Sequence, residues 1–160
     1  MRVLIVCSGN QPNFKFEIHQ AFVYDQVNSL KRLNHSIDFF FFFIKRKGFW
    51  GYLSYYRELK SFLKKNKIEL IHAHFVFSGL LANLQRKVPV ICSYHGTDIN
   101  NSKNRIFSFF VSLLSKKIIV VSKDLKRRSF FKNKNTIIPC GVDTDIFKPI
   151  EGKMLAVISN

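Results

Sequence analysis

Short apolar runs alternate with amphipathic segments along most of the chain, and this alternation constrains the fold more than any other feature. Apolar runs of strand length lie at residues 2–7, 37–44, 69–74, 88–93, 117–121 and 136–138. Amphipathic segments with helical spacing lie between them, at residues 17–33, 52–65, 78–85, 103–114 and 123–131. Because right-handed crossovers join strands that alternate with helices, we predict an α/β fold with a doubly wound, mostly parallel sheet. The unbroken phenylalanine run at residues 39–43 favours a strand covered on both faces.

Length and the positions of glycine and proline indicate the domain organisation, and the cysteines indicate the redox environment. The 160 residues fit one domain, and no apolar run is long enough to span a bilayer. The N-terminus enters a strand at once, without the pattern of a signal peptide. Gly and Pro punctuate residues 139–149, so we expect one domain over residues 1–149, followed at 150–160 by a linker and the start of another domain. Cys7, Cys92 and Cys140 lie far apart and have no CxxC spacing. Two of them sit on strand-like runs, which favours buried, reduced thiols in a cytosolic protein.

The most informative polar segment is VPVICSYHGTDIN, residues 88–100, in which an apolar strand runs directly into His95-Gly96-Thr97-Asp98. Gly96 allows a backbone conformation, or the close approach of a ligand, that a side chain would forbid. His95 supplies a titratable group, and Asp98 supplies a hydrogen-bond acceptor. The alternative interpretation is an ordinary turn in which Asp98 caps the next helix.

Polar residues that follow other strands should join this segment. Ligands of open α/β sheets bind beyond the carboxyl ends of the strands, so we expect the Ser8 turn, His74, His95 and Ser122 to gather along one edge. Ser122 should also cap the helix that follows it. His72 and His74 share one face of their strand and could seed a metal site, but no third ligand follows at a recognised spacing. We therefore predict no metal, and we expect His74 to line the cleft with His72 as a partly buried neighbour.

Several familiar motifs are missing from the sequence. No GxGxxG follows the first strand, and no GxxxxGK[ST] occurs, so neither a dinucleotide nor a P-loop phosphate site is indicated. No GxSxG supports a hydrolase.

The positive charge is large and uneven. The formal net charge is +16, and residues 45–67 hold eight basic residues against Glu58 alone, while residues 103–134 hold ten against Asp124 alone. Such bands can attract anionic lipid, nucleic acid or the phosphates of a sugar nucleotide, although an AT-rich coding sequence would give the same bias. A nucleic-acid-binding module is less favoured, because no recognised motif is present.

The segment at residues 52–67 combines aromatic residues with a basic face, a composition suited to lying on anionic lipid. Lys60, Lys64 and Lys65 are the predicted membrane contacts. In the alternative interpretation, the apolar side chains of this segment pack on the sheet and leave an ordinary solvated basic face.

Four sequence blocks, taken together, resemble a known family. In chain order they are LIHAHF, PVICSYHGTDIN, IIVVSKDL and IIPCGVDTDIFKP. Their order and spacing resemble the N-terminal half of a family 4 glycosyltransferase, and the opening SGNQPNF resembles a bacterial subgroup. Two departures stand out: of the usual glycine-rich first loop only Gly9 remains, and Cys140 replaces an asparagine. The resemblance implies a retaining enzyme of the two-domain GT-B architecture, with this chain as its Rossmann-like N-terminal domain.

The resemblance also implies roles for particular residues. His95 is expected beside the transferred sugar, where it would orient the sugar and help to stabilise charge as the leaving diphosphate departs. Gly9 and Asn10 are expected near the donor phosphates, where backbone amides can meet anionic oxygens. Further residues are expected at the acceptor side of the cleft: Gln26, His74, Gly96, Asp98 and Ser122. Asp98 would either position the loop that carries His95 or contact the acceptor.

The resemblance implies substrates and a location as well. The donor would be a nucleotide-diphosphate sugar, and the acceptor a glycan or a lipid-linked glycan of cell-surface polysaccharide synthesis, with no cofactor and no metal. The protein would be cytoplasmic and peripheral at the inner face of the cell membrane. The Glu-x7-Glu signature of the donor-binding domain does not occur, so we expect that domain to be missing and this chain to be inactive alone.

Overall fold

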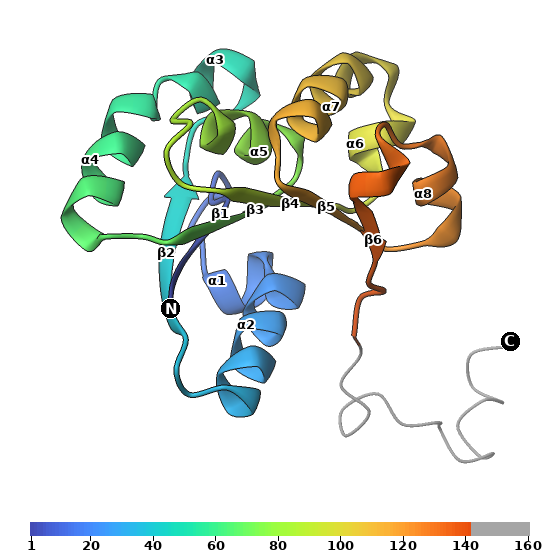
Figure 1. Ribbon diagram of the computed structural model, residues 1–160. Coiled ribbons are helices and arrows are strands. Elements are labelled where there is room, and N and C mark those ends of the chain that lie inside the picture. Colours follow the sequence, from blue (N-terminus) through green and yellow to red (C-terminus); the bar gives the residue numbers. More distant parts are fainter. Residues whose placement is uncertain (142–160) are drawn as a thin grey trace, which may run out of the picture.

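The computed structural model describes residues 1–141, and these form one six-stranded sheet in which every strand runs parallel to its neighbours (Figure 1). The strands are β1 (Arg2–Ser8), β2 (Asp38–Ile44), β3 (Leu70–His74), β4 (Val90–Tyr94), β5 (Lys117–Val120) and β6 (Asn135–Ile137). Their order across the sheet is β2-β1-β3-β4-β5-β6. The predicted doubly wound parallel sheet is confirmed, and each predicted strand forms.

The winding direction reverses between β1 and β3. From β1 the chain moves outward to β2, then returns past β1 to β3 and continues to β4, β5 and β6. In open α/β sheets this reversal opens a crevice at the carboxyl ends of the two strands. The residues that follow β1 and β3 therefore border the place where such a sheet binds its ligand.

Helices cover both faces of the sheet. One face carries α1 (Phe16–His19) and α2 (Ala21–Leu33), and the other carries α3 (Gly48–Leu53), α4 (Tyr56–Asn66), α5 (Val76–Asn83) and α7 (Ser102–Leu114) (Figure 1). The short helix α6 (Thr97–Asn100) leads into α7. The helix α8 (Lys123–Arg128) and the 3-10 helix η1 (Lys132–Lys134) connect β5 to β6.

Two segments predicted as single helices are divided. The first breaks at Gln20, whose backbone leaves helical geometry and whose side-chain amide donates to the carbonyl of Ser8 at 3.1 Å. The second is divided between α3 and α4, with Ser54 and Tyr55 between them. Apolar spacing continues across both breaks, so periodicity alone could not locate them. The predicted boundary beyond residue 141 and the segment 150–160 lie outside the described residues.

Alternate residues of the central strands fill two apolar layers. Leu4 and Val6 of β1 belong to the layer under α4, α5 and α7, whereas Ile5 and Cys7 belong to the layer under α2. Cys7 and Cys92 are buried and free, as expected, and burial raises the pKa of the Cys7 thiol to about 12. Cys140, which follows β6, is exposed.

The phenylalanine run forms β2, the edge strand beside β1. Its side chains pack into both layers, with Phe40 and Phe42 on one face and Phe39, Phe41 and Phe43 on the other. The prediction of two-sided packing is thus confirmed. Burial is less complete than in a central strand, because β2 has a neighbour on one side only.

Helix α4 turns its apolar face inward. Leu59 and Leu63 are buried against the sheet, while Lys60, Lys64 and Lys65 are exposed. This arrangement confirms the packing interpretation of the segment and leaves only its charged side open to solvent.

Candidate functional site

His95 occupies the carboxyl edge of the sheet, directly after β4, and is half-buried. Its ring lies between Phe22 of α2, at a centroid distance of 4.5 Å, and Phe75, which follows β3, at 4.8 Å. Ring contacts on two sides restrict the orientation of the imidazole. The site is therefore built from β3, β4 and the N-terminal turn of α2.

Three histidines form a row that leads to this position. The ring centroids of His72 and His74 are 4.3 Å apart, and those of His74 and His95 are 5.5 Å apart. His72 Nε2 lies 2.8 Å from Ser93 Oγ, and His74 Nδ1 lies 3.3 Å from His95 Nε2. In the last pair one nitrogen must donate and the other must accept, so the two rings hold complementary tautomers. His74 thereby influences which nitrogen of His95 carries the proton.

Burial keeps the three imidazoles neutral. It lowers the pKa of His72 and of His95 to about 4, and the pKa of His74 falls well below its usual value of 6.5. For His72 and His74, the neighbouring histidines lower the pKa further. Near neutral pH, His95 therefore meets a ligand as a neutral hydrogen-bonding group and not as a cation.

Asp98 holds the loop that carries His95. It is 1% exposed, and its Oδ2 accepts a hydrogen bond from the backbone N–H of His95 at 2.8 Å. Its Oδ1 accepts from the backbone N–H of Val76, the first residue of α5, at 2.7 Å. Burial raises the pKa of Asp98, while these backbone hydrogen bonds oppose that shift. Asp98 thus caps α5 from a distance in sequence and joins the ends of β3 and β4.

Two backbone conformations on this edge are unusual. Gly96 has φ +118°, a value that side-chain-bearing residues rarely adopt, which confirms the conformational reason for a glycine here. Phe75 has φ +70° although it carries a side chain. Strained backbone of this kind persists only where the surrounding structure enforces it, and it gathers at functional sites.

The loop after β1 lies at the same carboxyl edge of the sheet. Gly9 is buried, its N–H donates to the carbonyl of Ile44 at 2.9 Å, and a Cβ there would lie 2.8 Å from Phe43 Cβ. The glycine is needed for close packing against β2, and its amide is already paired. Asn10 is half-buried and is the next polar residue along the loop.

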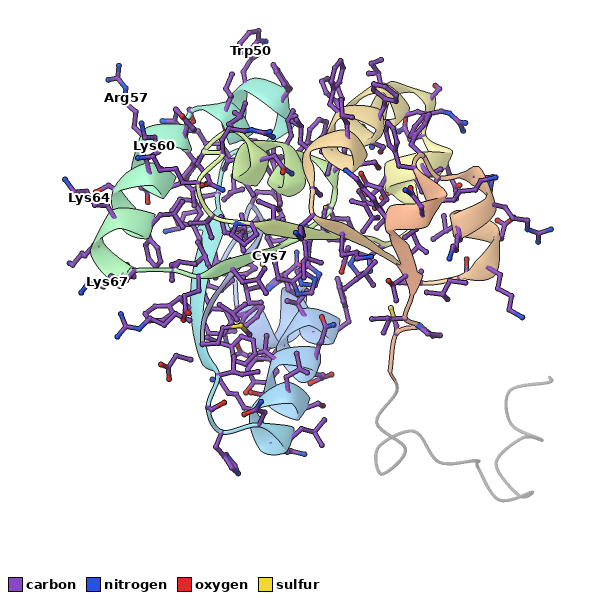
Figure 2. All side chains as sticks on the ribbon, in the orientation of Figure 1. Cys7, Trp50, Arg57, Lys60, Lys64 and Lys67 are labelled. Atoms are coloured by element: carbon purple, nitrogen blue, oxygen red, sulfur yellow. The ribbon has the colours of Figure 1, made fainter. Side chains whose placement is uncertain are left out.

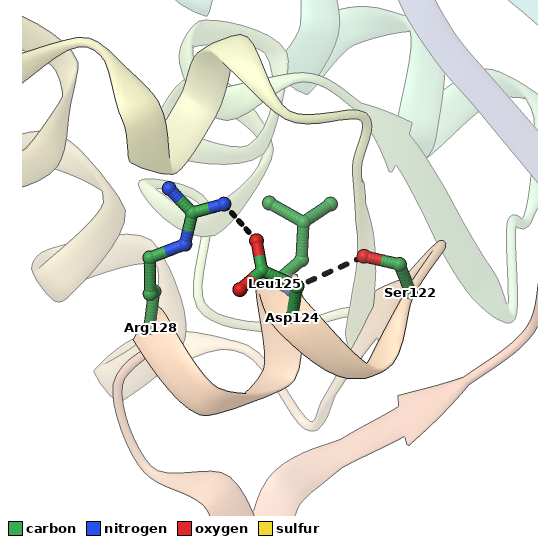
Figure 3. A network of polar contacts seen from close by, with 4 residues as sticks. All are labelled: Ser122, Asp124, Leu125 and Arg128. Atoms are coloured by element: carbon green, nitrogen blue, oxygen red, sulfur yellow. Dashed lines mark hydrogen bonds and ion pairs between the residues drawn. The ribbon is translucent and has the colours of Figure 1, made fainter.

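Ser122 lies at the end of β5 and caps α8, as predicted: its Oγ accepts a hydrogen bond from the N–H of Leu125 at 3.1 Å (Figure 3). In the same helix, Asp124 pairs with Arg128 (Figure 3).

Replacing Ser122 by alanine should lower the free energy of unfolding by about 1 kcal/mol, because one N-terminal amide of α8 loses its acceptor. Urea denaturation followed by circular dichroism measures this loss. Ser122→Gly should cost only a few tenths of that amount. The exposed residue Ser61 in α4 provides the control, and Ser61→Ala should not destabilise the protein. A Ser122→Ala protein as stable as the wild type would contradict the capping role.

The structure corrects two sequence-based placements. His74 is fully buried and not cleft-lining, because α2 covers this part of the sheet and Phe22 contacts its ring. Of the two roles expected for Asp98, the structure shows the positioning of the loop and not the acceptor contact, because backbone amides engage both carboxylate oxygens. Gln26 is half-buried one turn after Phe22, and Phe22 makes the ring contacts with the histidines.

Two residues at the site were missed. Phe22 and Phe75 flank His95, but in the sequence each looked like an ordinary core residue. Within residues 1–141, no group of three or more His, Cys, Asp or Glu side chains is arranged to hold a metal ion.

The fold and this edge define an open α/β domain of the kind that binds a ligand at its switch point, with two buried histidines behind the half-buried ring of His95. A sequence model described as Glycosyltransferase Family 4 matches residues 1–146. The chain belongs to glycosyltransferase family 4.

Individual relatives agree with this assignment. An uncharacterized glycosyltransferase of Methanocaldococcus jannaschii is 31% identical over an alignment 112 residues long, which covers 64% of this chain and 32% of the relative. The lipopolysaccharide outer core galactosyltransferase WaaB in its apo form superposes with a TM-score of 0.70 at 12% identity, covering 89% of this chain and 46% of that one. HepE from Anabaena, solved with UDP and glucose, has a TM-score of 0.59 at 14% identity, and the match covers 98% of this chain and 49% of HepE. The chain thus spans about a third of the curated relative and about half of these solved structures.

UDP-N-acetylglucosamine 2-epimerase shares the fold as well, with a TM-score of 0.60 at 12% identity, covering 86% of this chain and 47% of that one. The fold alone therefore does not separate sugar transfer from epimerisation. The match to the family model, and not the fold, assigns the chain to glycosyltransferase family 4.

Proposed function

We propose that this protein is the acceptor-side part of a retaining glycosyltransferase of the GT-B architecture. It would transfer a sugar from a nucleotide-diphosphate donor to a glycan or lipid-linked acceptor in cell-surface polysaccharide synthesis. The observation that carries the proposal is His95, a half-buried imidazole at the switch-point edge, positioned by Asp98 and His74. Its location would be cytoplasmic, at the inner face of the membrane.

In this reaction the bond between the anomeric carbon and the diphosphate oxygen breaks. A bond from the acceptor hydroxyl oxygen to the same carbon forms with the same stereochemistry, and the hydroxyl proton leaves toward the departing diphosphate. His95, neutral near pH 7, would donate a hydrogen bond to the sugar or accept one from it and so fix its orientation. Asn10 would lie toward the donor phosphates. Cationic groups of a donor-binding domain, and no metal or cofactor of this chain, would complete their neutralisation.

The test uses a protein that carries this chain together with a family 4 donor-binding domain. His95→Ala should lower kcat by about 100-fold, the scale expected for losing one group that stabilises the transition state. Transfer from a panel of nucleotide sugars measures turnover, and the configuration of the product by NMR reports retention. The exposed histidine His35 provides the control, and His35→Ala should leave turnover unchanged. Unchanged turnover in the His95 variant would contradict the proposed role. In a separate assay, the 160-residue chain alone should transfer no sugar.

A second candidate function is a non-catalytic module that binds an anionic surface. It is favoured by the exposed basic face of α4, which includes Lys60, Lys64 and Lys65. Nucleic acid is the less favoured surface, because no recognised binding motif accompanies the charge. The two functions are compatible, since the basic face and the site at His95 belong to different parts of the fold.

A further inference from the structure

Helix α7 carries an apolar stripe on the side that faces away from the sheet. Its inner side is buried through Ser108, Val111 and Ser112. On its outer side Ile106 is 57% exposed, and Phe110 and Leu113 are each 45% exposed. The spacing of these three residues, four and then three, places them on one face of the helix.

The stripe continues onto α3 through an aromatic bridge. Phe107 of α7 stacks on Phe49 of α3 at a centroid distance of 5.2 Å, and Phe49 contacts Trp50 at 4.9 Å. Trp50 is 76% exposed and projects outward (Figure 2). Through Phe49 and Phe107, Trp50 extends the apolar stripe of α7, and an exposed apolar patch rimmed by polar residues marks a site of protein or membrane interaction.

Basic residues border the apolar set. All eight Lys and Arg side chains between residues 45 and 67 are exposed, with Glu58 the single acidic residue in that range. Arg57 projects near the α3 end that carries Trp50, and Lys60, Lys64 and Lys67 follow along the outer side of α4, progressively further from Trp50 (Figure 2). Arg105 on α7 is also exposed.

We propose that this surface docks on the headgroup region of an anionic lipid bilayer. The docking surface consists of four apolar and five basic residues: Trp50, Ile106, Phe110, Leu113, Arg46, Lys47, Arg57, Lys60 and Lys64. Tryptophan favours the interface between water and hydrocarbon, and lysine stems can lie along apolar surface while their ammonium groups stay with the headgroups. The proposal rests on the second candidate function, binding of an anionic surface, and does not depend on the sugar-transfer function.

The charge distribution favours lipid over a second copy of the chain. Two identical copies meeting through this surface would bring their cationic bands together, and like charges oppose such contact. An anionic bilayer offers negative charge under every lysine and an apolar layer under the stripe. No helix within the described residues is long and apolar enough to cross a membrane. The proposed contact is therefore peripheral, with the domain lying on the bilayer surface.

The structure revises the sequence-based form of this idea. The tyrosines and phenylalanine of residues 52–67 face inward, with Tyr52 buried and Phe62 half-buried, so they cannot supply the apolar part. Trp50 and the α7 stripe supply it instead.

The test exploits the single tryptophan of the chain. The 160-residue protein is titrated with vesicles of phosphatidylcholine alone or mixed with phosphatidylserine. With the anionic vesicles, Trp50 emission should shift to shorter wavelength, and phospholipids brominated in the upper acyl chain should quench it. Binding should weaken as salt rises.

Matched variants separate the two parts of the docking surface. Lys60→Gln/Lys64→Gln should weaken binding by about tenfold or more, since each cation near the surface contributes about fivefold. Ile106→Gln/Phe110→Gln should weaken it by about tenfold through lost apolar contact, and the fluorescence shift should shrink. The control, Lys31→Gln/Arg32→Gln, removes the same charge from exposed residues at the end of α2, on the opposite face of the sheet, and should change binding less than threefold. Because all substituted side chains are exposed, thermal unfolding of the variants should match the parent.

Three results would overturn the proposal: equal binding to neutral vesicles, an unshifted and unquenched Trp50 on bound protein, or a control variant that loses as much binding as Lys60→Gln/Lys64→Gln. Sedimentation provides a separate check. A dimer in solution that Phe110→Gln dissociates would assign the surface to a second copy, and the lipid proposal would fail. Neither result bears on sugar transfer, which the His95→Ala assay tests independently.

Discussion

Asp98→Ala should lower the free energy of unfolding by about 4 kcal/mol, a large share of the stability of a domain this size. Both carboxylate oxygens accept hydrogen bonds from backbone amides, at Val76 and at His95. Alanine leaves both amides without that acceptor, and each buried donor without a partner costs about 1–3 kcal/mol. Chemical denaturation with two spectroscopic probes measures the loss.

Two further variants sharpen this expectation. Asp98→Asn keeps one acceptor oxygen and should lose about half as much stability. Asp124→Ala also removes a carboxylate, but Asp124 is exposed and pairs with Arg128 on the surface of α8, so the loss should stay below about 1 kcal/mol. If Asp98→Ala were no more damaging than Asp124→Ala, Asp98 would not be the link between β3 and β4.

The protein should lose stability steeply in acid, between pH 6.5 and about pH 4. His72 and His95 have a pKa of about 4 in the folded state, and the pKa of His74 is well below 6.5. The histidines of the unfolded chain become protonated near pH 6.5. Between that pH and about pH 4, the unfolded state therefore binds more protons than the folded state. The stability from neutral burial is fully present above pH 6.5 and falls with pH, by about 3 kcal/mol for His72 over the whole range. Asp98 has the opposite effect on stability: its pKa is raised in the folded state, so its contribution to stability increases as the pH falls.

Denaturation midpoints measured from pH 7 to pH 4 give this slope. His72→Gln removes one titrating group while keeping a nitrogen near Ser93, and it should flatten the slope by close to one proton. His35→Gln removes an exposed histidine and should leave the slope unchanged. A slope in His72→Gln as steep as in the wild type would mean that burial of this histidine is not its source.

The sheet could be predicted from the sequence because each strand has a recognisable local pattern. Each strand is a short apolar run, and parallel order follows from the alternation with helices. The gathering of His95 and Ser122 on one edge followed from the same topology. Ser122 could also be identified as a cap, because a cap acts on an amide three residues away.

The contacts that position the site residues, and the break in the first predicted helix, could not be predicted. They depend on residues far apart in the sequence, and a local pattern does not contain that information. Asp98 accepts from Val76, 22 residues earlier, and His74 meets His95, 21 residues later. Phe22 reaches the histidines only because α2 folds back over β3. Gln20 interrupts a helical pattern because its amide finds the carbonyl of Ser8 across the fold. The roles proposed for His95, Asn10 and Gln26 remain predictions.

The distribution of thiols gives this chain a natural position for a spectroscopic label. Cys7 and Cys92 are buried, and burial raises the pKa of both thiols, so they present little thiolate to a maleimide. Cys140 is exposed three residues after the end of β6, on the edge of the sheet that also carries His95. A fluorophore coupled there needs no cysteine to be added or removed. Such a label would test the binding of the ligands proposed above, a nucleotide sugar or a donor-binding domain, as a change in the environment of one defined point.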